Sequence, residues 1–398
     1  MNAFGARDRL TRPVVVAFGA PPVGKYPDDT PDDLAERALR EALATLDLPA
    51  GALDGLYLVA AGYARTVAPL RPQRLAERLG VPTRALTEIE CGGASALLAF
   101  KAACQDVALG HVELAAVVGA QAERELFDGG IDEGDIDRIL LVNAGFGPYL
   151  APLGLLAVVP VYALAAQRYL HDHGIEPAAV AELAVRLRER AARNPRAELR
   201  DPLTVDDVLG SRVVCPPIHK LEAAPWSDGA AAVIVCSQEL AHERGWPGAA
   251  LTGWGEAHDD ANFIPFGRDL TRYPWIGQAT EDALARAGRT RDELDVLEIY
   301  GAFAPAELMT YEVMDLCEPG GAAAAVARGE LENVNLSGGR LSLGHPPQAT
   351  PLLEVGEIFE QLTGRAGERQ LAGPQAGLVQ AEHGLMNGAA VAVLEASG

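Results

Sequence analysis

The chain has 398 residues and a formal net charge of −22, and 49% of its residues are hydrophobic while only 6% are aromatic. This length predicts two or more core units, and the negative charge argues against nucleic acid or an anionic membrane surface as a partner. Five cysteines without a CxxC pair argue against a disulfide framework and fit a reducing cytoplasm. Because we find neither a signal peptide nor an apolar run of membrane-spanning length, we expect a soluble cytoplasmic protein.

Short apolar runs alternate with helical patterns over the first third of the chain. We predict strands at residues 13–19, 56–60, 85–89 and 114–118, and helices at 30–46, 74–79 and 94–109. The first helix has Thr30 at its N-cap and Pro31 at its first position, where both residue types are favoured. Residues 125–155 are irregular and contain glycine and proline throughout, which is typical of a lid over a site or of a surface insertion.

The remainder of the chain repeats this alternation. We predict helices at 159–170, 177–194, 278–288, 305–316 and 351–362, and strands at 233–236, 251–254, 295–300 and 389–394. Two loops, at 335–347 and 378–388, contain glycines and carry one histidine each. Because both halves have the same strand–helix order without a literal repeat, the pattern predicts an α/β fold of two similar mixed-sheet units.

Cys91 lies in a sharp turn, Glu90-Cys91-Gly92-Gly93, between a predicted strand and a long small-residue helix. On the first turn of a helix, free N–H groups and the helix dipole stabilise a thiolate. The two glycines let a backbone or a substrate approach the sulfur. The turn therefore predicts an exposed nucleophile. The alternative is a buried packing residue, which is a common role of cysteine beside such a helix.

His345 and His383 lie in the two glycine-containing loops. Cysteine plus histidine is the minimal set for covalent acyl chemistry, because the thiolate attacks a carbonyl while the histidine holds or removes a proton near neutral pH. Backbone N–H groups of such loops can stabilise an oxyanion. The alternative for each histidine is an ordinary turn residue. We expect no metal site, because the other histidines lack a convincing set of ligands nearby.

The helix at 177–194 is basic in an acidic chain, with arginines at positions 186, 188, 190 and 193. One explanation is a solvated helix face whose arginines are balanced by nearby glutamates. The other is a dock for the phosphates of an anionic cofactor.

Taken together, these segments resemble the thiolase superfamily, specifically its branch of sterol-carrier-protein-type thiolases. Residues 90–121 resemble the family's nucleophile helix and the following strand, and residues 211–235 its domain-closing segment. Residues 298–321, 333–346 and 381–395 resemble a Phe-containing motif, a loop that ends in Gly-His-Pro and a closing strand. The Cys91 turn followed by Gly344-His345-Pro346 is the most specific part of the similarity.

The resemblance implies a thiolase-like five-layered αβαβα fold of two similar halves with an inserted loop domain. Residues 1–123 and 216–245 would form the N-terminal half, residues 124–215 the inserted loop domain, and residues 246–398 the C-terminal half. It also implies a homodimer or a dimer of dimers, and a possible small partner protein with an OB fold and a zinc ribbon.

The resemblance also assigns roles to individual residues. Cys91 becomes the acylated nucleophile, and His345 the base that activates it and stabilises an oxyanion. The N–H groups of Cys91 and Gly388 become a second oxyanion hole. We expect no permanently bound cofactor. Coenzyme A would enter as a thioester substrate.

The inserted loop domain would receive that thioester. The resemblance makes Arg186 and Arg190 possible contacts of the phosphates of coenzyme A, and it adds Phe303 of the Phe-containing motif to the cofactor-binding residues.

Two motifs depart from the family pattern. The branch has His-Asp-Cys-Phe where this chain has Tyr300-Gly301-Ala302-Phe303, and the closing loop also contains no cysteine. In the family a second cysteine moves the proton on the α-carbon during Claisen chemistry. Here His383 or Tyr300 could substitute for it.

We therefore expect a thiolase-like acyltransferase in which Cys91 carries an acyl group from an acyl-CoA or acyl-carrier donor. The next step would be Claisen or thiolytic carbon–carbon chemistry, or transfer to a biosynthetic acceptor. One alternative, prompted by Tyr300, is a thiolase-like retro-aldolase that acts on a β-hydroxyacyl-CoA. The other is a non-catalytic subunit of an acyltransferase complex.

Overall fold

The computed structural model describes residues 10–59, 70–82, 84–122, 158–259, 269–384 and 386–397. Its strands are β1 (Pro13–Gly19), β2 (Gly55–Val59), β3 (Ala85–Ile89), β4 (Leu114–Gln121), β5 (Val213–Cys215), β6 (Ile218–His219), β7 (Gly229–Ser237), β8 (Gly248–His258), β9 (Val296–Ile299), β10 (Ala376–Glu382) and β11 (Gly388–Ser397). Its helices are α1 (Pro31–Ala44), α2 (Arg71–Leu79), α3 (Ser95–Leu109), α6 (Val158–His173), α7 (Pro177–Ala191), α8 (Val205–Gly210), α9 (Gln238–Arg244), α10 (Pro274–Ala287), α11 (Ala304–Val313), α12 (Ala322–Arg328), α13 (Gly339–Leu343) and α14 (Thr350–Leu362).

Local sequence signals fix the start of α1. The Thr30 hydroxyl oxygen accepts a hydrogen bond of 3.2 Å from the Asp33 amide, and the Asp33 carboxylate accepts one of 2.8 Å from the Thr30 amide. Pro31 follows as the first helical residue. This reciprocal pair satisfies two N–H groups that have no partner inside the helix. The predicted N-cap is therefore confirmed.

Nine strands form one sheet in the order β3-β2-β4-β7-β1-β8-β11-β10-β9. From the centre outward, the first half runs β1-β7-β4-β2 and the second runs β8-β11-β10-β9. In both runs the first two pairs of neighbouring strands are antiparallel and the third pair is parallel. The prediction of two similar halves is thus confirmed, with β1 and β8 meeting at the centre.

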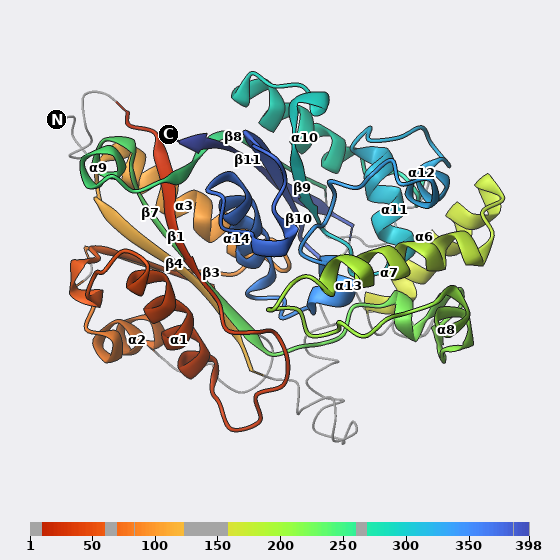
Figure 1. The fold of residues 1–398 in the computed structure, drawn as a ribbon, viewed down its shortest axis with the longest axis horizontal. Helices are drawn as coiled ribbons and strands as arrows, with labels where there is room; N and C mark the ends of the chain where they lie inside the picture. Colours follow the sequence, from red (N-terminus) through yellow and green to blue (C-terminus); the bar gives the residue numbers. More distant parts are fainter. Residues whose placement is uncertain are drawn as a thin grey trace.

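Helices cover both faces of each half of the sheet (Figure 1). In β7, Val233 and Val235 face a core shared with α3 and α14, whereas Ile234 faces the core shared with α1 and α2. In β11, Ala392 faces the middle core and Val393 faces the core shared with α10 and α11. This alternation follows from the two-residue period of a strand. It gives the five layers of the predicted αβαβα fold, with α3 and α14 in the middle.

The N-terminal ends of α3 and α14 are equivalent places in the two halves. The turn before α3 lies against the end of β10, because the Gly93 amide donates to the His383 carbonyl oxygen at 2.9 Å. The turn before α14 lies against the end of β4, because the Gln348 amide donates to the Gln121 side chain at 3.4 Å. Each half thus brings the start of its middle helix to a strand end of the other half.

Two predicted loops contain regular structure. Residues 378–388 were expected to be a loop, but Ala376–Glu382 form β10, which is hydrogen-bonded to both β9 and β11. That prediction was wrong because all seven residues are buried, so the sequence lacks the polar–apolar alternation of a half-exposed strand. Residues 339–343 form the short helix α13 within the predicted loop at 335–347.

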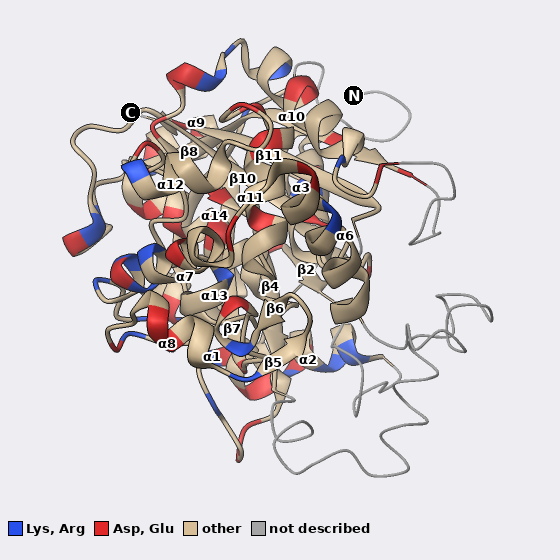
Figure 2. Ribbon diagram, turned by 90° about the vertical axis from the view of Figure 1, so that its right-hand side faces the viewer, with Lys and Arg blue, Asp and Glu red and all other residues tan. Residues whose placement is uncertain are grey.

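The described part of the predicted insertion packs on the C-terminal half. Helix α7 contacts α12 and α13, and α6 contacts α11. The short helix α8 and β5 complete this part, and β5 pairs with β6, which lies just beyond the predicted boundary at residue 215. Residues 124–157 of the predicted insertion lie outside the described residues. Figure 2 shows both basic and acidic residues on the ribbon around α7 and α8. Among the described helices, none is both long and apolar enough to cross a lipid bilayer.

Candidate active site

Four segments singled out in the sequence come together at the ends of α3, β9, β10 and the loop before α14. The Gly93 amide binds the His383 carbonyl oxygen at 2.9 Å. A Cβ placed on Gly93 would lie 3.3 Å from a ring carbon of Tyr300. The rings of Tyr300 and His345 are 6.2 Å apart and nearly perpendicular. The structure therefore brings the Cys91 turn, Tyr300, His345 and the backbone of His383 into one site.

Cys91 is half-buried and lies ahead of the helix rather than on its first turn, since α3 begins at Ser95. Burial and the Glu90 and Glu256 carboxylates raise the pKa of the Cys91 thiol. The expectation of a thiolate stabilised by the helix was therefore wrong. The physical reason is that burial disfavours the charged form, and that Glu256, on β8, adds negative charge from a distant part of the chain.

The amide of Cys91 also has a partner. It donates a hydrogen bond of 2.6 Å to the Ser95 hydroxyl, and that hydroxyl donates one of 2.6 Å to the Gly92 carbonyl oxygen. These bonds hold the turn together, with Gly92 in the left-handed region at φ 56°. The use of the Cys91 amide as an oxyanion donor stays a prediction.

His345 is 8% exposed and is held from both sides. Its amide donates to the Ser227 hydroxyl at 3.1 Å, and its Nδ1 lies 3.1 Å from the Thr350 hydroxyl. The Thr350 hydroxyl gives its own proton to the Pro346 carbonyl oxygen at 2.8 Å. It therefore accepts from Nδ1–H, which leaves the lone pair on Nε2. Burial and the Arg340 charge hold the pKa of His345 well below its usual range, so the ring is neutral.

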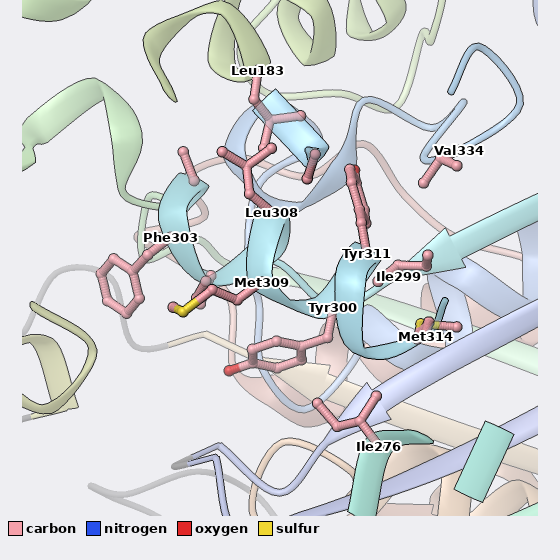
Figure 3. Close-up of a cluster of buried hydrophobic side chains, with 14 of the residues drawn as sticks. Leu183, Ile276, Ile299, Tyr300, Phe303, Leu308, Met309, Tyr311, Met314 and Val334 are labelled. Atoms are coloured by element: carbon pink, nitrogen blue, oxygen red, sulfur yellow. The ribbon is translucent and has the colours of Figure 1, made fainter. Parts of the chain in front are cut away.

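Tyr300 stands at the end of β9, in a position set by two amide side chains. Its amide donates to the Gln380 side-chain oxygen at 3.0 Å. The preceding residue, Ile299, donates to the Asn335 side-chain oxygen at 2.6 Å. The Tyr300 ring is 5% exposed and lies beneath α11 with Phe303 and Met309 nearby (Figure 3).

A buried cation lies over this ring. The Arg340 guanidinium is 3.8 Å from the Tyr300 ring centroid. Two hydrogen bonds of 2.8 and 3.1 Å hold it to the Glu354 carboxylate. A cation at this distance is attracted to the ring face and stabilises negative charge that develops on the phenol oxygen.

His383 contributes its backbone more than its ring. Its ring stacks on His258 at 6.2 Å, and its amide donates to the Gly388 carbonyl oxygen at 2.9 Å. Burial lowers the pKa of His383, the Glu256 carboxylate opposes this, and His258 adds to it. A Cβ on Gly388 would lie 2.5 Å from the His383 ring, so this glycine makes room for the ring. The catalytic role of His383 and the oxyanion role of Gly388 stay predictions.

The sequence reasoning missed Glu382, the last residue of β10. Its side chain is 2% exposed, and its carboxylate accepts hydrogen bonds from the Tyr162 hydroxyl at 2.7 Å and from the Met386 amide. Burial raises the pKa of Glu382 to about 7, although these hydrogen bonds and the Arg340 charge oppose the shift. A glutamate at the end of an apolar run was the available signal, but it lay in the segment predicted to be a loop.

The residues expected to contact coenzyme A have protein partners. Arg186 pairs with Glu182 at 2.9 Å on its own helix. Arg190 donates to the Leu331 carbonyl oxygen at 2.8 Å and thereby ties α7 to the segment that follows α12. Phe303 is buried, with its ring 4.8 Å from that of Tyr162. Binding of coenzyme A by these residues stays a prediction. In the described ranges no group of three His, Cys, Asp or Glu residues is arranged to hold a metal ion.

The comparison with protein families decides the family. Residues 13–239 match the thiolase N-terminal domain, and residues 255–396 match the thiolase C-terminal domain-like family. This chain belongs to the thiolase family. The resemblance inferred from the Cys91 turn and the Gly-His-Pro loop is thus confirmed.

Relatives of this thiolase-family protein have different activities. Acetyl-CoA acetyltransferase of Methanothermobacter thermautotrophicus is 28% identical over 76% of this chain and 78% of its own. Human sterol carrier protein 2 is 27% identical over 91% of this chain and 66% of its own, in agreement with the inferred branch. A steroid side-chain-cleaving aldolase of Thermomonospora curvata is 27% identical over 82% of both chains.

A solved structure supports the same fold for this thiolase-family protein. The complex named Ltp2-ChsH2(DUF35) aldolase matches with a TM-score of 0.83 and 24% identity, over 98% of both chains.

Proposed function

We propose that this protein cleaves, or in reverse forms, the carbon–carbon bond between Cα and Cβ of a 3-hydroxyacyl-CoA thioester by acid–base catalysis. The observation that carries the proposal is the pairing of Tyr300 with His345, 6.2 Å apart, under a buried arginine. A retro-aldol reaction requires one group that accepts a proton and another that donates one. The relative that is a steroid side-chain-cleaving aldolase supports the same reaction class.

The proposed reaction needs no covalent intermediate. His345 accepts the proton of the β-hydroxyl group at Nε2, and the C–O bond becomes a carbonyl as the Cα–Cβ bond breaks. The electron pair of that bond moves to the thioester as an enolate. The Tyr300 hydroxyl then gives a proton to the α-carbon. The products are an aldehyde or ketone and a shortened acyl-CoA, so all atoms and charges balance.

The state of Cys91 favours this reaction over acyl transfer. Its pKa is raised by burial and by two carboxylates, whereas a nucleophilic cysteine works as the thiolate. In this proposal Cys91 shapes the turn beside the substrate.

The second candidate is the thiolase-like acyltransferase, in which Cys91 carries the acyl group. It is favoured by the half-exposed thiol in a glycine turn and by the relative that is an acetyl-CoA acetyltransferase. The two candidates differ in one variant. Replacement of Cys91 by alanine abolishes acyl transfer and leaves retro-aldol cleavage within about a factor of ten.

The test uses 3-hydroxybutyryl-CoA, 3-hydroxy-3-methylbutyryl-CoA and a steroid side-chain thioester as probes, with released carbonyl compound and acyl-CoA as readouts. We expect cleavage by the wild type and by Cys91→Ala, and a loss of about 10²-fold or more in Tyr300→Phe and His345→Gln. Tyr169→Phe is a matched control, because Tyr169 is also buried but contacts Glu312. Retained cleavage in Tyr300→Phe would overturn the proposal.

Intact mass after incubation with acetyl-CoA tests the second candidate in the same samples. A gain of one acetyl group that is lost in Cys91→Ala, but kept in the control Cys215→Ala, would establish an acyl-enzyme. Cys215 is a suitable control because it is another half-buried free cysteine.

We also propose a homodimer and a small partner protein as the working assembly. The fold neighbour whose name includes DUF35 supports a partner. Light scattering measures the mass of the assembly, and the cleavage assay is run with the chain alone and with an added protein of the DUF35 class. Activity that appears only when the partner is added would agree with the alternative in which this chain is a non-catalytic subunit of a complex.

A further inference from the structure

Glu382 is a buried carboxylate that lacks an ion pair among the described residues. Glu354 is paired with Arg340 at 2.8 Å and Glu357 with Arg369 at 2.9 Å. Among the described residues, Glu382 has no such ion pair, and its charge is met by one hydroxyl and one amide. Keeping a carboxylate away from both water and a paired cation costs stability. Glu298 and Glu307 are also buried without an ion pair in the described ranges, so the feature particular to Glu382 is that its hydroxyl partner, Tyr162, is linked to Tyr300.

The hydroxyl that binds Glu382 leads toward the active site. The Tyr162 hydroxyl donates to the Glu382 carboxylate at 2.7 Å and also shares a hydrogen bond with the Tyr300 side chain. Tyr162 has a single hydroxyl proton, which it can donate to only one of these two partners at a time. When that proton lies toward Glu382, the Tyr300 hydroxyl is the donor to the Tyr162 oxygen. Tyr162 is 1% exposed and Tyr300 is 5% exposed, so both tyrosines are buried from bulk solvent.

Glu382, Tyr162 and Tyr300 form a row of hydrogen-bonded groups, and the direction in which they donate can reverse. When Glu382 is protonated, its O–H can donate to Tyr162, Tyr162 to Tyr300, and Tyr300 to a group in the active site. Each hydroxyl in such a row passes on one proton and receives another, so no charge remains on a tyrosine. Because the pKa of Glu382 is about 7, both directions are populated near neutral pH.

We propose that Glu382, Tyr162 and Tyr300 form a proton-transfer row that supplies the α-carbon proton during carbon–carbon bond cleavage. This inference rests on the proposed function. Tyr300 gives its proton to the enolate carbon and receives one from Tyr162, which receives one from Glu382. After the products leave, His345 releases its proton to solvent in the open site, and a proton taken up at Tyr300 passes back along the row to Glu382. The row thus transfers the α-carbon proton in a chain that lacks the second cysteine expected to transfer it.

Glu382 acts through Tyr162 and Tyr300, so it is a positioning and proton-storing residue rather than a catalytic one. The groups that face it are Tyr162 from α6, Tyr273 before α10, Tyr300 at the end of β9, Arg340 on α13 and the Met386 amide. The titration of Glu382 is therefore compared between the wild type and variants that each change one of these groups.

The first measurement needs no substrate. Infrared spectra of the wild type minus those of Glu382→Gln, taken from pH 5 to pH 9, isolate the protonated carboxyl band of Glu382. We expect a midpoint near pH 7 that moves upward in Tyr162→Phe and, by a smaller amount, in Tyr300→Phe. Tyr169→Phe is the matched control, since it removes a tyrosine–glutamate bond from the same helix. A midpoint below about pH 5, or one that neither variant moves, would overturn the row.

The second measurement is the pH profile of kcat/KM for 3-hydroxy-3-methylbutyryl-CoA cleavage. Because Glu382 donates in its protonated form, activity should fall as the pH rises through about 7. Glu382→Gln should lower kcat by about 10- to 100-fold and remove this alkaline limb, with KM little changed, whereas Glu382→Asp should recover part of kcat. An alkaline limb retained in Glu382→Gln would overturn the row. If the wild type cleaves no probe, the proposed function fails, and the infrared result alone decides whether the row exists.

Discussion

The Gly93 amide donates a hydrogen bond of 2.9 Å to the His383 carbonyl oxygen, which joins the turn that carries Cys91 to the end of β10. This approach of two backbones leaves no space for side chains. A Cβ on Gly92 would lie 2.0 Å from the same carbonyl oxygen, and Gly92 also has a φ of 56°. The two halves of the fold therefore meet at the active site through glycine.

Gly92→Ala should be strongly destabilising. It combines a left-handed backbone with a clash against the backbone of His383, and together these should lower the free energy of unfolding by about 3 kcal/mol or more. Gly174→Ala is the control, because Gly174 has a φ of 62° but no atom within 4 Å of the position that a Cβ would take. It should cost only about 1 kcal/mol. Equal losses in urea denaturation would contradict the role of the close approach.

Thr350→Val should impair His345 without changing its surroundings much. Valine has a similar shape but cannot accept the hydrogen bond from Nδ1, so the Nε2 lone pair is no longer enforced. We expect kcat to fall by about tenfold or more with little change in KM. Thr350→Ser keeps the hydroxyl and should retain most of kcat. Steady-state cleavage kinetics test this, and equal activity of the valine and serine variants would argue against a fixed tautomer.

Arg340→Met should reduce both stability and activity, for different reasons. It leaves the Glu354 carboxylate buried without its guanidinium, which should cost about 3–5 kcal/mol. The double variant Arg340→Met with Glu354→Leu removes both charges and should recover most of the stability. It should not recover activity, because the cation over Tyr300 is still absent. A fully active double variant would show that Arg340 has only a structural role.

The free energy of unfolding should fall as the pH rises from about 5 to 8, in part because of Glu382. Its pKa is raised from 4.5 to about 7, so between these values the folded state holds more protons than the unfolded state. By linkage, Glu382 stabilises the folded state fully at a pH below its pKa in the unfolded chain. This stabilisation is lost as the pH rises through its pKa in the folded state. At about 1.4 kcal/mol per pH unit the loss reaches about 3 kcal/mol.

Glu382→Gln should lack this part of the pH dependence. Comparison with the wild type also cancels the effect of Glu307, another buried carboxyl whose pKa burial raises to about 7. The measurement is urea unfolding of both proteins at pH 5.5 and pH 8. Parallel losses in the two proteins would place the pKa of Glu382 near its ordinary value.

Arg186→Gln and Arg190→Gln separate cofactor binding from structure. If Arg186 contacts a phosphate of coenzyme A, its replacement should raise KM for the thioester about three- to tenfold and leave stability unchanged, because its ion pairs lie on the helix surface. Arg190→Gln should lower stability, since Arg190 holds backbone carbonyl oxygens. Arg168→Gln on α6, which removes another surface ion pair, is the control for loss of charge. No change in KM would remove Arg186 from the phosphate site.

Local signals in the sequence were enough for much of the fold. Thr30, Pro31 and Asp33 specify the start of α1 because an N-cap depends on residues within one helical turn. The same order of strands and helices in both halves, with the Cys91 turn and the Gly-His-Pro loop, led to the thiolase family. The sequence also indicated Cys91, Tyr300, His345 and His383 as neighbours, and their segments do meet.

The chemical state of these groups depended on tertiary contacts. The pKa of the Cys91 thiol is raised by burial, by the neighbouring Glu90 carboxylate and by the carboxylate of Glu256, although 165 positions separate Glu256 from Cys91 in the chain. Glu382 gained its importance only from burial and from Tyr162, which lies 220 positions earlier. Electrostatic and hydrogen-bonding effects act over a few ångströms in space, whatever the separation along the chain. The sequence by itself thus determined the family and the place of the site, and the tertiary structure decided which of its groups hold protons.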